Sequence, residues 1–220
     1  MTKHFQNEIE RLKKKILRLA AMVEEALQRA MKATTQQDIE LADSVIGSDP
    51  TIDSYEIEVE EDCLKILALH QPVAADLRYV IAVLKINSDL ERIADLAVNI
   101  AERARDLTTR PDSSPSFDLT SMLDTVMKMV RQSVDALVRQ DVNMAREVIR
   151  NDDIVDEFHR EAYCFGLKEM RANLGSIEFH VSLLSVSRNL ERIADHATNI
   201  AEDVIYMIEG EIVRHQGTGD

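Results

Sequence analysis

The sequence predicts an all-α protein made of two tandem three-helix bundles that are related by an internal repeat. The composition favours helices, because apolar residues other than aromatics dominate: hydrophobic residues make up 45% of the 220 residues, aromatics make up 4%, and there are six Gly and four Pro. Apolar residues recur at helical spacing along most of the chain. One polar segment occurs twice, far apart, which indicates two copies of one structural unit.

The repeated segment is Leu90–Asp95, which recurs as Leu190–Asp195 with the same six residues, LERIAD. Both copies continue to the sequence NIAE, at positions 99–102 and 199–202. The offset of 100 positions matches a common domain size, so each copy belongs to a unit large enough to bury a core of its own. Much of what repeats is polar, which packing alone does not require. The repeat therefore also indicates a site.

The first unit is predicted to span residues 1–108. Its first helix covers about 5–34, where apolar residues recur at i, i+3 and i+4. Helical pattern continues over 36–46, is interrupted by the sequence GSDP at 47–50, and resumes until about 69. Pro72 then opens a long helix that extends to about 107, because Pro is tolerated in the first turn of a helix.

A linker is predicted over residues 109–117, which include two Pro and three Ser. The second unit, 118–210, has predicted helices at about 118–139, 141–171 and 176–209, and a C-terminal tail covers 211–220. The second helices align as well, 38–53 with 141–156, at an offset of 103. Three amphipathic helices joined by short loops fold most simply as an antiparallel bundle.

Charge and hydropathy exclude several classes of protein. The formal net charge of −14 and the isoelectric point near 4.9 leave no basic footprint for nucleic acid. No run approaches the ~20 apolar residues of a membrane span, and the N-terminus lacks the apolar core of a signal peptide. We therefore expect a cytoplasmic location without direct membrane insertion. Cys63 and Cys164 are predicted to be reduced thiols in the core.

Pairs of carboxylates four residues apart form the candidate site of each unit. Such a pair lies on one helix face, where like charges repel unless something offsets them. The third helix of each unit carries one pair and the second helix carries another; the residues are Glu91, Asp95, Glu191, Asp195, Asp49, Asp53, Asp152 and Asp156. If the two helices are neighbours, four carboxylates converge in each unit. Arg92 and Arg192, or a bound hard cation, would offset their charge.

Two other interpretations of these carboxylates stay open. In an acidic protein a single Glu-x-x-x-Asp is usually an ordinary solvated pair, although its duplication favours a cation site. A catalytic di-iron centre requires Glu-x-x-His on two helices, and the nearest match, Asp156 to His159, occurs once. No nucleophile triad, Gly-rich phosphate loop or dinucleotide motif is apparent. The chain is predicted to be non-enzymatic.

A helix-to-helix corner precedes the third helix of the first unit, at the sequence HQPVAADLR (residues 70–78). It is either a corner stabilised by an acid near a helix N-terminus or a docking surface for a partner. The candidate partner-binding residues are Gln71, Pro72, Asp76 and Arg78. The second unit has no counterpart of the Gln-Pro pair, so this role belongs to the first unit alone.

Taken together, these segments resemble the PhoU family of bacterial phosphate-uptake regulators. The resemblance lies in residues 71–78, in both ERIAD motifs with their downstream NIAE, and in the paired Asp-x-x-[Ile/Val]-Asp stretches at 49–53 and 152–156. It covers nearly the whole chain. Ala94 and Ala194 stand where many members carry Gly. The replacement of Gly by Ala at these two positions does not remove any of the candidate metal ligands.

The resemblance implies a cytoplasmic adaptor without catalytic activity. Such an adaptor helps to repress phosphate-starvation genes and restrains phosphate transport when phosphate is ample. The implied partners are the ATPase subunit of the phosphate transporter and a sensor histidine kinase, and the implied assembly is a homodimer. The resemblance also implies metal ions on the acidic motifs, with iron and zinc beside Mg²⁺ or Mn²⁺ as candidates, and no organic cofactor. Two alternatives are a metal-binding or storage bundle and a purely structural oligomerising bundle.

Overall fold

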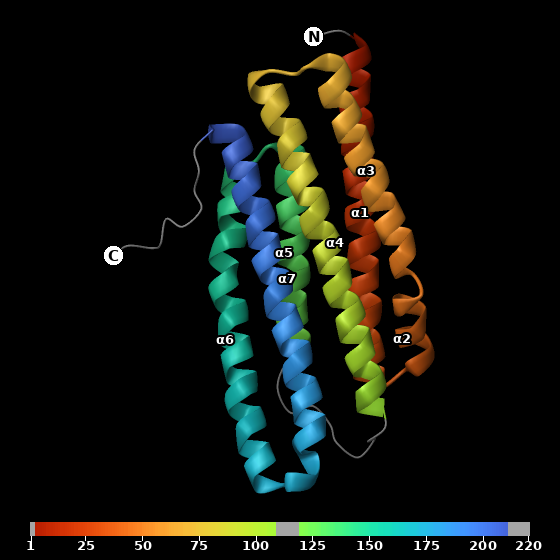
Figure 1. Cartoon of the computed structure of the whole chain (residues 1–220). Coiled ribbons are helices and arrows are strands. Elements are labelled where there is room, and N and C mark those ends of the chain that lie inside the picture. Colours follow the sequence, from red (N-terminus) through yellow and green to blue (C-terminus); the bar gives the residue numbers. More distant parts are fainter. Residues whose placement is uncertain (1–2, 109–118, 211–220) are drawn as a thin grey trace, which may run out of the picture.

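The computed structural model describes residues 3–108 and 119–210, which form helices and no strand (Figure 1). The all-α prediction is confirmed. In the first unit the helices are α1 (Lys3–Gln36), α2 (Ile39–Ile46), α3 (Asp49–His70) and α4 (Ala74–Thr108). In the second unit they are α5 (Leu119–Arg139), α6 (Val142–Ala172), a 3₁₀ turn (Leu174–Ser176) and α7 (Ile177–Glu209).

The internal repeat extends to the turns. Gln37 and Gln140, 103 positions apart, both adopt a left-handed conformation with φ of 53°. Each is followed by an Asp that caps the next helix: the Asp38 carboxylate accepts a hydrogen bond from the Leu41 amide, and Asp141 caps α6 in the same way. These caps satisfy amides that a helix start leaves unpaired, so both units make the same turn for the same physical reason.

Two predicted helix boundaries are corrected by the structure. The helical pattern over 36–46 is not continuous with the preceding helix, because the turn at Gln37 separates α1 from α2. Pro72 does not open α4, which begins at Ala74. Gln71, with φ of 45°, ends α3 in a left-handed conformation, and Pro72 and Val73 lie in the corner before the next helix. The predicted interruption at 47–50 separates α2 from α3, with Pro50 in the first turn of α3.

The two units lie side by side, with α4 and α7 at the centre (Figure 1). These helices run antiparallel, as the contacts between them show. The Arg78 Nε–H donates to the Met207 carbonyl (3.0 Å), Lys85 Nζ lies 3.0 Å from Asp203 Oδ1, and His196 Nδ1 lies 2.8 Å from Asp89 Oδ1. Helices α1 and α3 flank α4, whereas α5 and α6 flank α7.

One hydrophobic core runs through both units, although the sequence suggested a core for each. Buried side chains from α1 to α7 form a single cluster that includes Ile93 and Ile193, both fully buried. Helices α1 and α5 also pack across the units, where Arg131 Nη2 lies 2.7 Å from Glu24 Oε2. The repeated helices therefore bury their apolar faces against each other as well as within their own unit.

Other predictions concern cysteines and chain segments. Cys63 is buried as expected, but Cys164 is exposed, so the prediction of a second core thiol is wrong. Residue 164 points outward on α6, a helix whose outer face is not covered. The predicted linker at 109–117 and the tail at 211–220 lie outside the described residues. None of the described helices is both long enough and apolar enough to cross a membrane.

Candidate functional site

In the first unit, α3 and α4 bring the predicted carboxylates together. We call Asp49, Asp53, Glu91 and Asp95 the first carboxylate cluster. Burial raises the pKa of Asp49, and the charges of Asp53 and Asp95 raise it further. Burial likewise raises the pKa of Glu91, with a contribution from Asp95 that Arg92 partly opposes. Asp49 and Glu91 therefore resist ionisation, first because they are partly buried and then because other carboxylates lie near them.

In the second unit, α6 and α7 repeat this arrangement. The second carboxylate cluster consists of Asp152, Asp156, Glu191 and Asp195. Burial, followed by the charges of Asp195 and Asp156, raises the pKa of Asp152 to about 6. Burial also raises the pKa values of Glu191 and Asp195, each with a contribution from a neighbouring carboxylate. The upward shift is thus largest at Asp152, where burial contributes most.

Arginines offset part of this charge, but not in the same way in the two units. Arg92 Nη1 lies 3.1 Å from Asp95 Oδ2, and its Nε lies 3.5 Å from Glu91 Oε2, as the sequence predicted. In the second unit the ion pair to Glu191 comes from Arg188, one turn earlier, at 2.5 Å. Arg192 acts on Glu191 and Asp195 only through its longer-range charge.

Some carboxylate oxygens in both clusters have no hydrogen-bond donor. Asp49 Oδ1 and Glu191 Oε2 are enclosed, and no donor among the described residues reaches either atom. An enclosed carboxylate oxygen without a donor costs free energy that a cation would recover. Carboxylate oxygens are the ligands that hard or borderline divalent ions prefer. In neither cluster, however, do three of the described side chains bring ligand atoms within 4.8 Å of one another.

The comparisons with known proteins bear on the whole chain. The family model for the PhoU domain matches it twice, over residues 16–104 and 119–204, one match for each repeat unit. The chain belongs to the PhoU family. The resemblance read from the ERIAD motifs is confirmed, and so is the fold of two tandem three-helix bundles.

Relatives share most of their length with this PhoU-family chain. The phosphate-specific transport system accessory protein PhoU homolog of Aquifex aeolicus is 43% identical over 213 residues, 95% of each chain. The homolog of Pseudomonas putida is 36% identical over 99% of this chain and 85% of its own. The crystal structure of PhoU from Pseudomonas aeruginosa superposes with a TM-score of 0.90 at 35% identity, covering 94% of this chain and all of that one.

Each PhoU repeat has a further polar pair beside its carboxylate cluster that the sequence analysis missed. In the first unit, Asn87 Nδ2 donates to Glu56 Oε1 at 2.7 Å. In the second unit, His159 Nδ1 lies 2.9 Å from Ser187 Oγ. The repeat offsets of 103 and 100 relate Glu56 to His159 and Asn87 to Ser187, so extending the helix alignment would have found both pairs.

The electrostatics link these pairs to the clusters. The Glu56 charge contributes to the raised pKa of Glu91, and burial raises the pKa of Glu56 itself. Burial lowers the pKa of His159, with Arg188 adding to the shift and Asp156 opposing it. The first cluster therefore has a fifth carboxylate beside it, whereas the second has an imidazole whose neutral form is favoured.

The predicted partner-binding residues have different environments. Gln71 is exposed at the corner between α3 and α4, next to the half-buried Pro72. Asp76 lines a surface cavity of about 530 Å³ between the starts of α1 and α4. Arg78 instead turns toward α7 and donates to the Met207 carbonyl, so its observed contact joins the two units.

Exposed apolar side chains do gather at this corner. Leu69, Val73 and Leu77 have 65%, 74% and 39% of their surface exposed. The corresponding end of the second unit exposes Leu174 (77%) and Val181 (54%). Both helix-to-helix corners therefore present apolar surface that no described part of the chain covers.

Proposed function

We propose that this chain is a non-enzymatic, cytoplasmic adaptor that restrains phosphate uptake and the phosphate-starvation response when phosphate is ample. The two PhoU-domain matches carry this proposal, together with relatives named as accessory proteins of the phosphate-specific transport system over nearly the full length. A solved PhoU from Streptococcus pneumoniae, 28% identical with a TM-score of 0.85, is named a regulatory protein of that system. The proposed partners are the transporter ATPase subunit and a sensor histidine kinase.

The corner around Gln71 and Pro72 is the surface we propose for one of these partners. Its support is the exposed apolar group formed by Leu69 and Val73 on a rigid helix-to-helix corner. Apolar side chains of this kind supply binding free energy when a partner covers them. The family resemblance also implies a homodimer.

Reporter output in a deletion strain tests the adaptor role. With ample phosphate, the strain is expected to express a phosphate-regulated reporter at high level, and the wild-type gene is expected to silence it. A Gln71→Ala/Val73→Asp variant is expected to restore silencing only in part, whereas Leu174→Asp at the other corner serves as its matched control. Normal repression in the deletion strain would contradict the role, and full silencing by the corner variant would contradict the surface.

We also propose that both carboxylate clusters bind divalent cations. The support is the electrostatic coupling of the carboxylates in each unit, which a bound ion would draw closer together, and the donor-free oxygens of Asp49 and Glu191. A bound cation would neutralise the mutual repulsion and join α3 to α4 and α6 to α7. Iron, zinc, Mn²⁺ and Mg²⁺ are the candidates, and the imidazole of His159 favours the transition metals at the second cluster.

Metal analysis of purified protein tests this second part. Glu91→Gln/Asp95→Asn and Glu191→Gln/Asp195→Asn are each expected to lose the metal of one unit. The matched control is Glu25→Gln/Glu147→Gln, which removes two exposed carboxylates on α1 and α6 from outside the clusters. Equal metal content in all four proteins would show that the clusters are ordinary solvated carboxylates.

The alternative function is a metal-storage or metal-dependent bundle without signalling. It rests on the same two clusters and predicts bound redox metal whose visible spectrum changes with oxygen or peroxide. The adaptor proposal predicts no such change. Retained reporter control together with an inert metal spectrum would exclude this alternative.

A further inference from the structure

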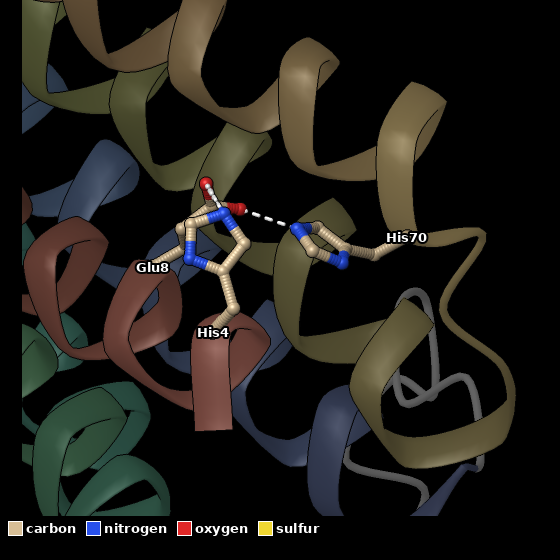
Figure 2. Close-up of side chains that lie close together, drawn as sticks. All are labelled: His4, Glu8 and His70. Atoms are coloured by element: carbon tan, nitrogen blue, oxygen red, sulfur yellow. Dashed lines mark hydrogen bonds and ion pairs between the residues drawn. The ribbon is translucent and has the colours of Figure 1, made fainter. Parts of the chain in front are cut away.

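Three metal-ligating side chains meet at the end of the first unit where α1 begins and α3 ends (Figure 2). They are His4, Glu8 and His70, and one ligand atom of each lies within 4.8 Å of the other two. The His70 Nε2–H donates to Glu8 Oε2 at 2.6 Å, and His4 Nε2 lies 3.4 Å from Glu8 Oε1. Two imidazole nitrogens thus approach the two oxygens of one carboxylate.

The sequence places these groups by ordinary helix geometry. His4 and Glu8 are four residues apart and share a face of α1. His70 is the last residue of α3, immediately before the left-handed Gln71 turns the chain away. The ring of Phe5, itself buried, lies 5.2 Å from the His70 ring and holds it against α1. His70 comes from far along the chain, so the sequence alone could not have joined it to the other two.

The three side chains differ in how far they are exposed to solvent. The side chains of Glu8 and His70 are 17% exposed, whereas that of His4 is 75% exposed. Glu8 and His70 are therefore preorganised, and His4 can rotate onto a bound ion from solvent. Arg11 and Lys65 line a cavity of about 40 Å³ beside Glu8, but neither makes an ion pair with it among the described residues.

We propose that His4, Glu8 and His70 form a site for a divalent first-row transition metal, with Zn²⁺ as its probe, in which water completes the coordination. Two imidazoles and one carboxylate are a ligand set that Zn²⁺ accepts. Tetrahedral ligands at bonds of about 2.0–2.1 Å lie about 3.3 Å apart. The 3.4 Å between His4 and Glu8 already matches this spacing, and the His70–Glu8 pair opens when the metal replaces the proton between them.

This site is separate from the carboxylate clusters. Asp53 precedes His70 by 17 residues of α3, which corresponds to about 25 Å along the helix. The ligand chemistry differs as well, because nitrogen donors exclude Mg²⁺, which requires oxygen ligands. A metal here would join the start of α1 to the end of α3, next to the exposed corner at Val73.

Zn²⁺ titration of the full chain in excess Mg²⁺ tests the site, with calorimetry and imidazole NMR as readouts. The first equivalent of Zn²⁺ is expected to shift the ring signals of His4 and His70, each assigned from its His→Gln variant. His70→Gln is expected to weaken this binding about 100-fold and His4→Gln about tenfold. His196→Gln, at the Asp89 contact between α4 and α7, is the matched control and is expected to retain it.

Two results would overturn the proposal. One is Zn²⁺ binding by His4→Gln and His70→Gln that equals the wild type. The other is a titration that shifts only the His159 ring, which would assign the ion to the second carboxylate cluster. His4→Gln keeps the test decisive even if His70→Gln destabilises the corner, because His4 is mostly exposed. Neither result would affect the adaptor proposal, which does not depend on this site.

Discussion

The two repeat units hold the same four carboxylates but different neighbours. Beside the first cluster stands Glu56, hydrogen-bonded by Asn87, and beside the second stands His159, in contact with Ser187. The neighbour of the first cluster is thus a carboxylate, whereas the neighbour of the second is an imidazole on which the Asp156 charge acts. The duplicated carboxylates therefore do not imply duplicated chemistry, because one substituted neighbour would change which cation each unit prefers if the proposed ions bind.

The units also differ in the helix that carries Asp49 or Asp152. In the first unit Gly47 and Ser48 interrupt this helix, and Asp49 starts α3. In the second unit α6 continues through the same region, which places Asp152 in the middle of a helix and in a more dehydrated environment. A carboxylate near a helix start is stabilised by the helix dipole, and one in the middle of a helix is not.

The largest expected effect tests whether the two units unfold as one. Ile93→Ala and Ile193→Ala each empty a fully buried position in the continuous core. Each is expected to lower the free energy of unfolding by about 3 kcal/mol. Urea unfolding followed by circular dichroism should show one transition in both variants. Two transitions, with each variant moving only one of them, would mean that the units are independent.

A smaller expected effect concerns the proposed difference in metal preference between the two carboxylate clusters. In a Glu91→Gln/Asp95→Asn background, which leaves the second cluster intact, His159→Ala is expected to weaken Zn²⁺ binding about tenfold and Mg²⁺ binding little. Glu56→Gln in the Glu191→Gln/Asp195→Asn background is expected to weaken Mg²⁺ binding at the first cluster. Calorimetry with both ions measures this. If His159→Ala and Glu56→Gln weakened Zn²⁺ binding equally, each in its own background, the two clusters would not differ in metal preference.

The raised pKa of Asp152 predicts a pH dependence in metal-free protein. Between its ordinary value of 3.8 and about 6, the folded protein holds a proton that the unfolded chain has lost. The contribution of Asp152 to stability therefore falls as pH rises through this window, and it levels off above it. Asp152→Asn is expected to stabilise the protein by about 1 kcal/mol above pH 6, after allowance for partial solvation, and by little below pH 4.

Asp49→Asn in the first unit is the matched comparison for that measurement. Its pKa is raised in the same direction, by burial and by Asp53 and Asp95. We expect a smaller gain than for Asp152→Asn in the same chelator-treated series of denaturation curves. A loss of stability above pH 6 in either variant would contradict the view that burial and mutual repulsion disfavour the charged carboxylates in these clusters.

The smallest expected effect concerns the contact between the units. His196 meets Asp89, whereas the repeat puts Leu96 and Asn189 at the corresponding positions. His196→Leu leaves Asp89 without this partner and is expected to cost up to about 1 kcal/mol. The double variant His196→Leu/Asp89→Asn copies the other pair and is expected to recover most of that loss. A double-mutant cycle without coupling would show that the contact contributes nothing.

Local pattern and repetition predicted much of this architecture. The helical spacing of apolar residues located the long helices, and the doubled ERIAD motif located two units with a carboxylate pair in each. The spacing of four between Glu91 and Asp95 was enough to place both on one face. For that shared face, the spacing along one helix contained the answer.

Contacts between helices could not be read in the same way. His70 meets His4 and Glu8 only because α1 and α3 are antiparallel. Even within α7, the spacing did not reveal that the side chain of Arg188 rather than that of Arg192 reaches Glu191. Pro72 was misplaced because the left-handed conformation at Gln71 is set by the corner rather than by its own residue type. Cys164 lies in an apolar stretch whose outward face only packing could reveal.

The antiparallel pair of α4 and α7 makes this molecule resemble a homodimer enclosed in a single chain. The last helix of each unit packs against the last helix of the other unit, as equivalent helices do in a twofold-symmetric dimer. A unit expressed alone would expose the apolar face that α4 or α7 now covers. We therefore expect such a unit to form a homodimer through this face. The interface between its two subunits would correspond to the one that α4 and α7 form within the single chain.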